Sequence, residues 1–127
     1  MEDRMTAVKI GGKTYKMLFS LAASKAICKK YGSLDSMGDK VMAGANEESI
    51  ESVSWMLDLL IEQGRLALHF DGDDSQQKLT QEQIETLLTV GDLADLMASV
   101  RECITRGTKR SIKTEDETDH SEDEEKN

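Results

Sequence analysis

The chain has 127 residues, of which 38% are hydrophobic, and a formal net charge of −9. This length suits one domain with a modest core, and the negative charge argues against a partner bound through nucleic-acid phosphates. The N-terminal residues lack the basic region and apolar run of a signal peptide. The longest apolar stretch, residues 55–61, is interrupted by Asp58 and is far shorter than a membrane span. We therefore expect an intracellular protein that binds neither nucleic acid nor a membrane.

The N-terminal region predicts a β-hairpin. Residues 5–10 and 13–19 are two extended runs, and Gly11 and Gly12 between them suit the positive φ angles of a tight turn. One face of the second run carries three large apolar side chains, Tyr15, Met17 and Phe19. Because an isolated hairpin is only marginally stable in water, we expect this face to pack on helices or the hairpin to pair with another chain.

Local signals then mark two consecutive helices. Ser20 is a good N-cap for a helix over residues 21–31, and Gly32 follows that helix at the position where glycine commonly ends one. Ser33 is the expected N-cap of a short second helix. The chain from residue 20 to residue 34 therefore predicts a helix, a glycine stop and the start of another helix.

Three more helices are predicted after a break at residues 44–46. The first, over residues 47–68, is the longest element, and its apolar side chains cover more than one stripe, so it is expected to be central to the fold or to contact a partner as well. Thr80 and Gln83 match the capping box of a fourth helix, which is predicted to end at Gly91. Asp92 is predicted to cap a fifth helix. The apolar stripe of that helix consists of Leu93, Leu96, Met97, Val100 and Ile104.

The expected fold class is mainly α, with an N-terminal β-hairpin followed by about five helices. This helical domain is assigned to residues 1–106, and residues 107–127 are assigned to a disordered acidic tail. Residues 115–127 carry eight acidic side chains and one lysine, a composition that cannot bury enough apolar surface to offset the entropy cost of ordering.

One acidic loop partly matches a calcium-binding pattern. Four side chains fall at ligand positions of an EF-hand register, namely Asp71, Asp73, Ser75 and Glu82. The position that needs glycine for the sharp turn is Gln76, and Glu82 is already explained as an acidic residue in the first turn of a helix. A solvated acidic loop is the preferred interpretation, and a calcium-sensing module is the alternative.

The other reactive side chains do not form a catalytic or metal-binding pattern. Cys28 and Cys103 are isolated thiols without the spacing of a zinc site, and we expect them to be free and at least half-buried. His69 has no nearby nucleophile or paired carboxylate in the sequence. We therefore expect no catalytic residue, no metal and no cofactor, which makes a binding protein more plausible than an enzyme.

Two charged segments have alternative interpretations. Lys25, Lys29 and Lys30 are either a solvated helix face or a docking face for an acidic partner. The acidic tail is either a solubilising appendage or a segment that screens an adhesive surface until a partner arrives.

The order of the motifs resembles one protein family. The family pattern has a strand of the form G-x-x-Y-x-L-x-F, a helix ending in an aromatic residue followed by Gly-Ser-Leu, a long helix with a tryptophan, and a Leu-Thr-x-Glu helix. The matching residues in this chain are Gly12, Tyr15, Met17, Phe19, Tyr31, Gly32, Ser33, Leu34, Trp55 and residues 79–82. Over residues 5–106 the chain therefore resembles the tail assembly chaperones of long-tailed bacteriophages and prophages. It departs from the family at two places. Met17 stands where the family usually has leucine or another aliphatic residue, and Lys29 and Lys30 stand at a helix end that is often acidic in the family.

The resemblance implies a non-catalytic protein that acts in the host cytoplasm and is not part of the mature virion. Its expected partners are the tape measure protein, which it would coat, and the tail tube protein, whose subunits it would help to recruit. Homo-oligomerisation is left open. The other function considered is an acidic regulatory or inhibitory protein that mimics nucleic acid, which requires carboxylates spaced along an ordered face.

The expected partner-binding residues are apolar or aromatic side chains on three helices. They are Ile27, Tyr31, Trp55, Met56 and Met97. The alternative for all five is a place in the core, and for Ile27 and Trp55 it is the preferred interpretation.

Overall fold

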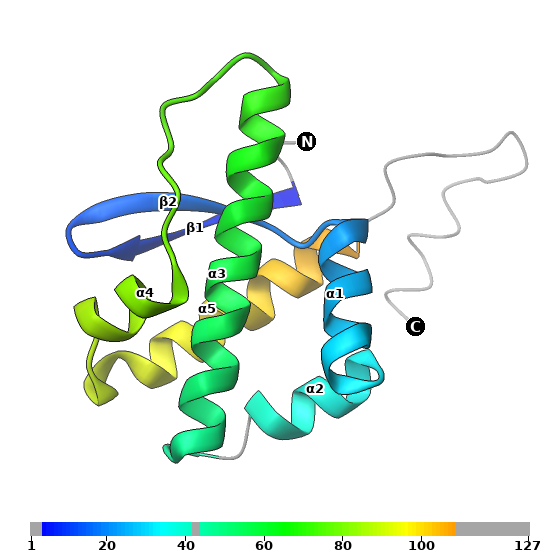
Figure 1. Ribbon diagram of the computed structural model, residues 1–127, viewed down its shortest axis with the longest axis vertical. Coiled ribbons are helices and arrows are strands. Elements are labelled where there is room, and N and C mark those ends of the chain that lie inside the picture. Colours follow the sequence, from blue (N-terminus) through cyan, green and yellow to red (C-terminus); the bar gives the residue numbers. More distant parts are fainter. Residues whose placement is uncertain (1–3, 42–43, 109–127) are drawn as a thin grey trace, which may run out of the picture.

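The structure, a computed structural model, describes residues 4–41 and 44–108 (Figure 1). It contains an antiparallel hairpin and a set of helices packed around one long helix, which confirms the predicted fold class. The elements are β1 (Met5–Ile10), β2 (Lys13–Leu18), α1 (Leu21–Tyr31), α2 (Leu34–Val41), α3 (Glu47–Phe70), α4 (Gln81–Leu87), the short 3-10 helix η2 (Val90–Asp92) and α5 (Leu93–Gly107). Among the helices described, none is both long enough and apolar enough to cross a bilayer.

The hairpin forms as the glycine pair predicts. Gly11 and Gly12 have φ angles of 62° and 82°, as a two-residue turn of this hand requires, and they join strands paired from Met5 with Leu18 to Ile10 with Lys13. β2 packs against α3, and β1 packs against α5. The side chains of the hairpin that are buried in this contact include Val8, Ile10, Tyr15 and Met17. Packing on helices, rather than pairing with another chain, therefore buries the apolar face of the hairpin.

The central element is α3, which contacts β2 and all four other α-helices (Figure 1). Its N-terminus is closed by a capping box in which the Asn46 side chain accepts from the backbone N–H of Ser49 and the Ser49 hydroxyl accepts from the N–H of Asn46. It approaches the hairpin closely at Gly64, where an added Cβ would lie 2.2 Å from the carbonyl oxygen of Lys16. Glycine is thus the residue that lets α3 and β2 meet backbone to backbone.

The predicted helix ends near the hairpin are confirmed. The Ser20 hydroxyl accepts a hydrogen bond of 3.1 Å from the backbone N–H of Ala23 at the start of α1. Gly32 has a φ angle of 92° and donates its N–H to the carbonyl oxygen of Cys28 at 2.8 Å. The Thr80 hydroxyl and the Gln83 side chain form the predicted capping box of α4.

Three predicted boundaries are corrected. α3 continues to Phe70 instead of ending at residue 68, and α4 ends at Leu87 instead of Gly91. The early end of α4 arises because Thr89 opens η2 and its backbone N–H donates to the Asp92 carboxylate at 2.9 Å. The Asp92 carboxylate therefore accepts its hydrogen bond from Thr89 and does not cap the N-terminus of α5 with its side chain. Gly107, the first residue assigned to the tail, is the last residue of α5, and residues 109–127 lie outside the described part of the chain.

The loop between α3 and α4 is attached to the hairpin by one side chain. The Gln76 amide accepts from the backbone N–H of Lys16 at 2.7 Å and donates to the Lys16 carbonyl oxygen at 3.0 Å. It also donates to the carbonyl oxygen of Ile61 on α3 at 3.1 Å. Gln76 thus supplies to the outer edge of β2 the donor and acceptor that a neighbouring strand would otherwise supply.

Replacing Gln76 with alanine is expected to lower the free energy of unfolding by about 2 kcal/mol, because the partly buried Lys16 amide and carbonyl would lose their partners. Gln77→Ala is the matched control, since Gln77 is exposed beside it, and a change within about 0.5 kcal/mol is expected. Urea unfolding measures both values, and hydrogen exchange at the Lys16 amide reports the local effect. Equal stabilities for the two variants would show that the loop is not attached through Gln76.

Candidate binding site

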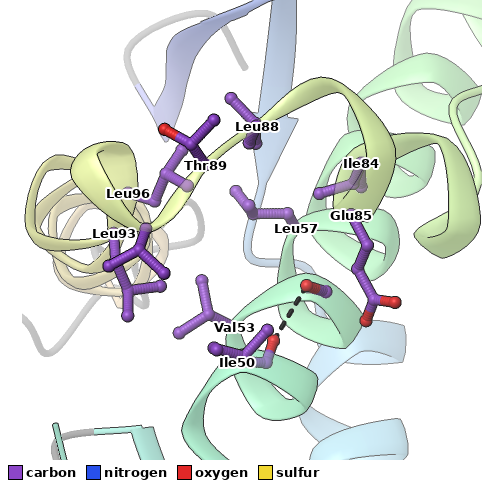
Figure 2. Close-up of a pocket in the computed structure, with 11 residues that line it drawn as sticks. Ile50, Val53, Leu57, Ile84, Glu85, Leu88, Thr89, Leu93 and Leu96 are labelled. Carbon is purple, nitrogen blue, oxygen red and sulfur yellow. Dashed lines mark hydrogen bonds between the residues drawn. The ribbon is translucent and has the colours of Figure 1, made fainter. Parts of the chain in front are cut away.

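An apolar cleft lies between α3, α4, η2 and the start of α5 (Figure 2). Its volume is about 310 Å³. The residues that line it are Ile50, Val53, Ser54, Leu57, Ile84, Glu85, Leu88, Thr89, Val90, Leu93 and Leu96. Because an apolar cavity of about 150 Å³ can hold a benzene molecule, this cleft is large enough for about two apolar side chains of a partner.

The walls of the cleft follow from the helix pattern. α3 contributes Ile50, Val53 and Leu57 from one face, which Figure 2 shows opposite the α5 side chains Leu93 and Leu96. The hydroxyl of Ser54, one of the few polar groups in the lining, donates to the Ile50 carbonyl oxygen at 2.8 Å, a bond drawn as a dashed line in Figure 2. The Ser54 hydroxyl is thereby satisfied within its own helix, so the floor of the cleft stays apolar.

The rim of the cleft combines an exposed apolar side chain with a carboxylate. Val90 on η2 is 64% exposed and lines the cleft. Glu85 on α4 lines the opening as well, and its carboxylate accepts a hydrogen bond from the Gln81 side chain at 3.2 Å. An occupant that suits this site therefore has an apolar face and carries a basic group near Glu85.

The five predicted partner-binding residues are buried or half-buried, and they do not form one exposed surface. Ile27 and Met56 are completely buried and offer no surface to a partner in this structure. This agrees with the preferred core interpretation of Ile27 and corrects the expectation for Met56. Ile27 lies on the buried face of α1, and Met56 is one of the buried residues of α3. Met97 is half-buried on α5 and packs against the core. None of the five predicted residues lines the apolar cleft.

Tyr31 and Trp55 are brought together. Their rings are half-buried and pack edge to face, with centroids 5.8 Å apart at an interplanar angle of 83°. The Lys30 ammonium lies 5.0 Å from the Trp55 ring centroid and 5.7 Å from the Tyr31 centroid, within cation–π range of both rings. This cluster packs the C-terminal end of α1 against α3, and both rings lie at the edge of the core and not inside it.

The carboxylates Asp73 and Asp74 of the acidic loop interact with neighbouring residues of the chain. The Asp73 carboxylate accepts from the backbone N–H and the hydroxyl of Ser75, at 2.9 Å and 2.6 Å, and these bonds lower the pKa of Asp73. The Nδ1 atom of His69 lies 2.5 Å from a carboxylate oxygen of Asp74. Within residues 4–41 and 44–108, no group of three or more His, Cys, Asp or Glu side chains is placed to hold a metal ion.

The two cysteines are free thiols in different environments. Cys103 is completely buried on α5, and desolvation raises its pKa to about 11. Cys28 is exposed on α1, contrary to the expectation that it is at least half-buried. The difference arises because Cys28 follows Ile27 on the helix and therefore points away from the buried stripe.

Sequence reasoning did not find the cleft. It predicted only that the apolar side chains of residues 47–68 cover more than one stripe and that Leu93 and Leu96 belong to the stripe of the fifth helix. The signal that was available is the excess apolar width of α3, which indicated a role beyond one packing face. The break between α4 and η2, which opens the cleft, was hidden by the prediction of a continuous helix to Gly91.

Comparison of the chain with protein-family models, with characterised proteins and with solved structures gives no match. The resemblance to tail assembly chaperones therefore rests on the sequence motifs. Several of these motif residues support the fold itself, since Tyr15, Met17 and Phe19 are buried and Gly32 ends α1.

Proposed function

We propose that this protein is a tail assembly chaperone that binds an apolar helical segment of a tape measure protein. It acts without catalysis in the host cytoplasm, helps to recruit tail tube subunits and leaves before the virion is complete. The observation that carries the proposal is the apolar cleft between α3, α4 and α5, which is open to solvent at Val90. The ordered series of motifs from Gly12 to residue 82 supports the choice of family.

The form of the cleft suits a helix. Its walls are the helical segments α3, α4, η2 and the start of α5, and a partner helix presents side chains at positions i, i+3 and i+4 that fit between such walls. The occupant is an amphipathic helix whose apolar face enters the cleft and whose flanking basic residue meets Glu85. The net charge of −9 keeps a protein with an open apolar cleft soluble, because copies repel one another.

Co-expression with a tape measure protein tests the proposal. We expect the two proteins to co-purify and the tape measure protein to stay soluble. The control is the same tape measure protein expressed with an unrelated acidic protein of similar size, with which it is expected to aggregate. The proposal fails if the tape measure protein aggregates equally with both partners and this chain elutes alone.

A further inference from the structure

The outer face of α1 is basic and partly apolar. α1 contains three lysines and no acidic residue, and Lys25 and Lys29 are exposed on its outer face. In the part of the chain that the structure describes, no ion pair involves either of these two ammonium groups. Beside them lie Leu21, which is 89% exposed, and the exposed thiol of Cys28, on a shallow hollow. We call Leu21, Lys25, Cys28 and Lys29 the outer face of α1.

The described chain ends beside this face. The last turn of α5 packs on the segment that leads into α1, since a Cβ at Gly107 would lie 2.4 Å from the Cβ of Phe19. Phe19 immediately precedes Ser20, the N-cap of α1. Figure 1 shows the orange end of α5 next to the first turn of α1. Whatever follows Thr108 therefore leaves the fold at the N-terminal end of α1.

The remaining sequence has the length and charge to reach the outer face. Residues 115–127 carry eight carboxylates and one lysine. The seven residue-to-residue steps from Thr108 to Glu115 can span up to about 23 Å. α1 has 11 residues, and a helix of that length is about 16 Å long. Carboxylates that follow Glu115 can therefore lie over Lys25 and Lys29.

We propose that the acidic segment 115–127 docks on the outer face of α1 in the same chain. The two surfaces have opposite charge, and the connection gives the segment an effective concentration in the millimolar range, which favours it over a second copy or a free acidic peptide at ordinary concentrations. Exposed ion pairs are individually weak and are screened by salt. The docked state is therefore reversible, sensitive to ionic strength, and released by a basic partner that takes up the segment. The proposal does not depend on the proposed function, because it concerns a contact within one chain.

The alkylation rate of Cys28 measures the docking, because its thiol lines the hollow that the segment would cover. N-ethylmaleimide is the probe, and the completely buried Cys103 is expected to react far more slowly. The comparison variant keeps the length of the tail and replaces each Glu with Gln and each Asp with Asn. The positions replaced are Glu115, Asp116, Glu117, Asp119, Glu122, Asp123, Glu124 and Glu125.

At low ionic strength we expect Cys28 to react about three-fold faster with the neutral tail than with the acidic tail, since docking by weak ion pairs is incomplete. The ratio of the two rates should fall to about one in 1 M salt, where the Debye length is about 3 Å. The ratio should also fall to one when both tails are tested in chains that carry Lys25→Gln and Lys29→Gln. Both rates in that ratio come from chains without the two lysines, so the direct effect of the lysines on the Cys28 thiolate cancels. A ratio of one at low salt in the unmodified background overturns the proposal.

Carbodiimide cross-linking then locates the segment. We expect amide bonds between carboxylates of residues 115–125 and Lys25 or Lys29, identified by mass spectrometry. A sample that mixes nitrogen-14 and nitrogen-15 chains should give links within one isotope only. Links to the hairpin lysines Lys9 and Lys13 alone, or links between isotopes, would overturn the proposal, the latter by placing the segment on a second copy.

Discussion

Replacing Gly64 with alanine is expected to lower the free energy of unfolding by about 3 kcal/mol and the melting temperature by about 10–20 °C. The added Cβ would lie 2.2 Å from the carbonyl oxygen and 2.7 Å from the carbonyl carbon of Lys16, and 3.1 Å from the backbone nitrogen of Met17. All three atoms belong to the backbone of β2, so no side chain can rotate away. The strand must move from α3, which disturbs the core and the Gln76 hydrogen bonds together.

Helix propensity alone gives the opposite expectation for Gly64. Alanine in a helix interior is favoured over glycine by about 1 kcal/mol, so packing has to overcome that gain. Gly38→Ala in α2 is the matched control, because an added Cβ there meets no atom within 4 Å. We expect that variant to gain about 0.5–1 kcal/mol. Calorimetry and urea unfolding compare the two substitutions. If both stabilise the protein, α3 and β2 are not in direct backbone contact.

The parts of the fold that were predicted are those coded by neighbouring residues. Ser20 and Gly32 act within one turn of α1, and the Thr80–Gln83 capping box spans four residues of sequence. The two glycines of the hairpin turn likewise act locally, because their positive φ angles suit the twist of the strands they connect. Each of these signals needs no knowledge of the tertiary structure, and each predicted element was found.

The parts that were missed depend on contacts between distant residues. The Gln76 side chain bonds to Lys16, 60 positions away, so nothing near Gln76 distinguishes it from the exposed Gln77. Asp92 was a sound cap candidate, but its carboxylate accepts from Thr89 and ends α4 early. Sequence periodicity showed that Met56 lies on the apolar part of α3, and only the packing of the hairpin and other helices around α3 shows that no solvent reaches it.

The cleft illustrates the same limit on the candidate site. Leu93 and Leu96 were recognised as apolar positions of the fifth helix, but their grouping with Ile84, Leu88 and Val90 depends on how α4, η2 and α5 turn around α3. An apolar residue that fills the core and one that lines an open cleft obey the same helical period. Sequence therefore predicted surplus apolar surface on the helices, and only the structure shows that part of it lines one cleft.

Val90→Lys is expected to weaken binding of the tape measure protein at least about ten-fold, because an occupant of the cleft would have to bury an ammonium group among apolar side chains. Val90 is 64% exposed, so the free protein keeps its stability within about 0.5 kcal/mol, which thermal unfolding checks. The affinity is measured by titration calorimetry with the tape measure segment that co-purifies with the unaltered chain.

Phe70→Lys is the control that separates the cleft from exposed apolar surface in general. Phe70 is 79% exposed at the end of α3, outside the cleft lining, and a lysine there is also favourable for the helix dipole. We expect its affinity to equal that of the unaltered chain. If instead Phe70→Lys abolishes binding and Val90→Lys does not, the partner binds at the C-terminal end of α3. That result would leave the chaperone function standing but would exclude the cleft as the binding site. Both variants add one lysine, so the difference between them would come from its position alone.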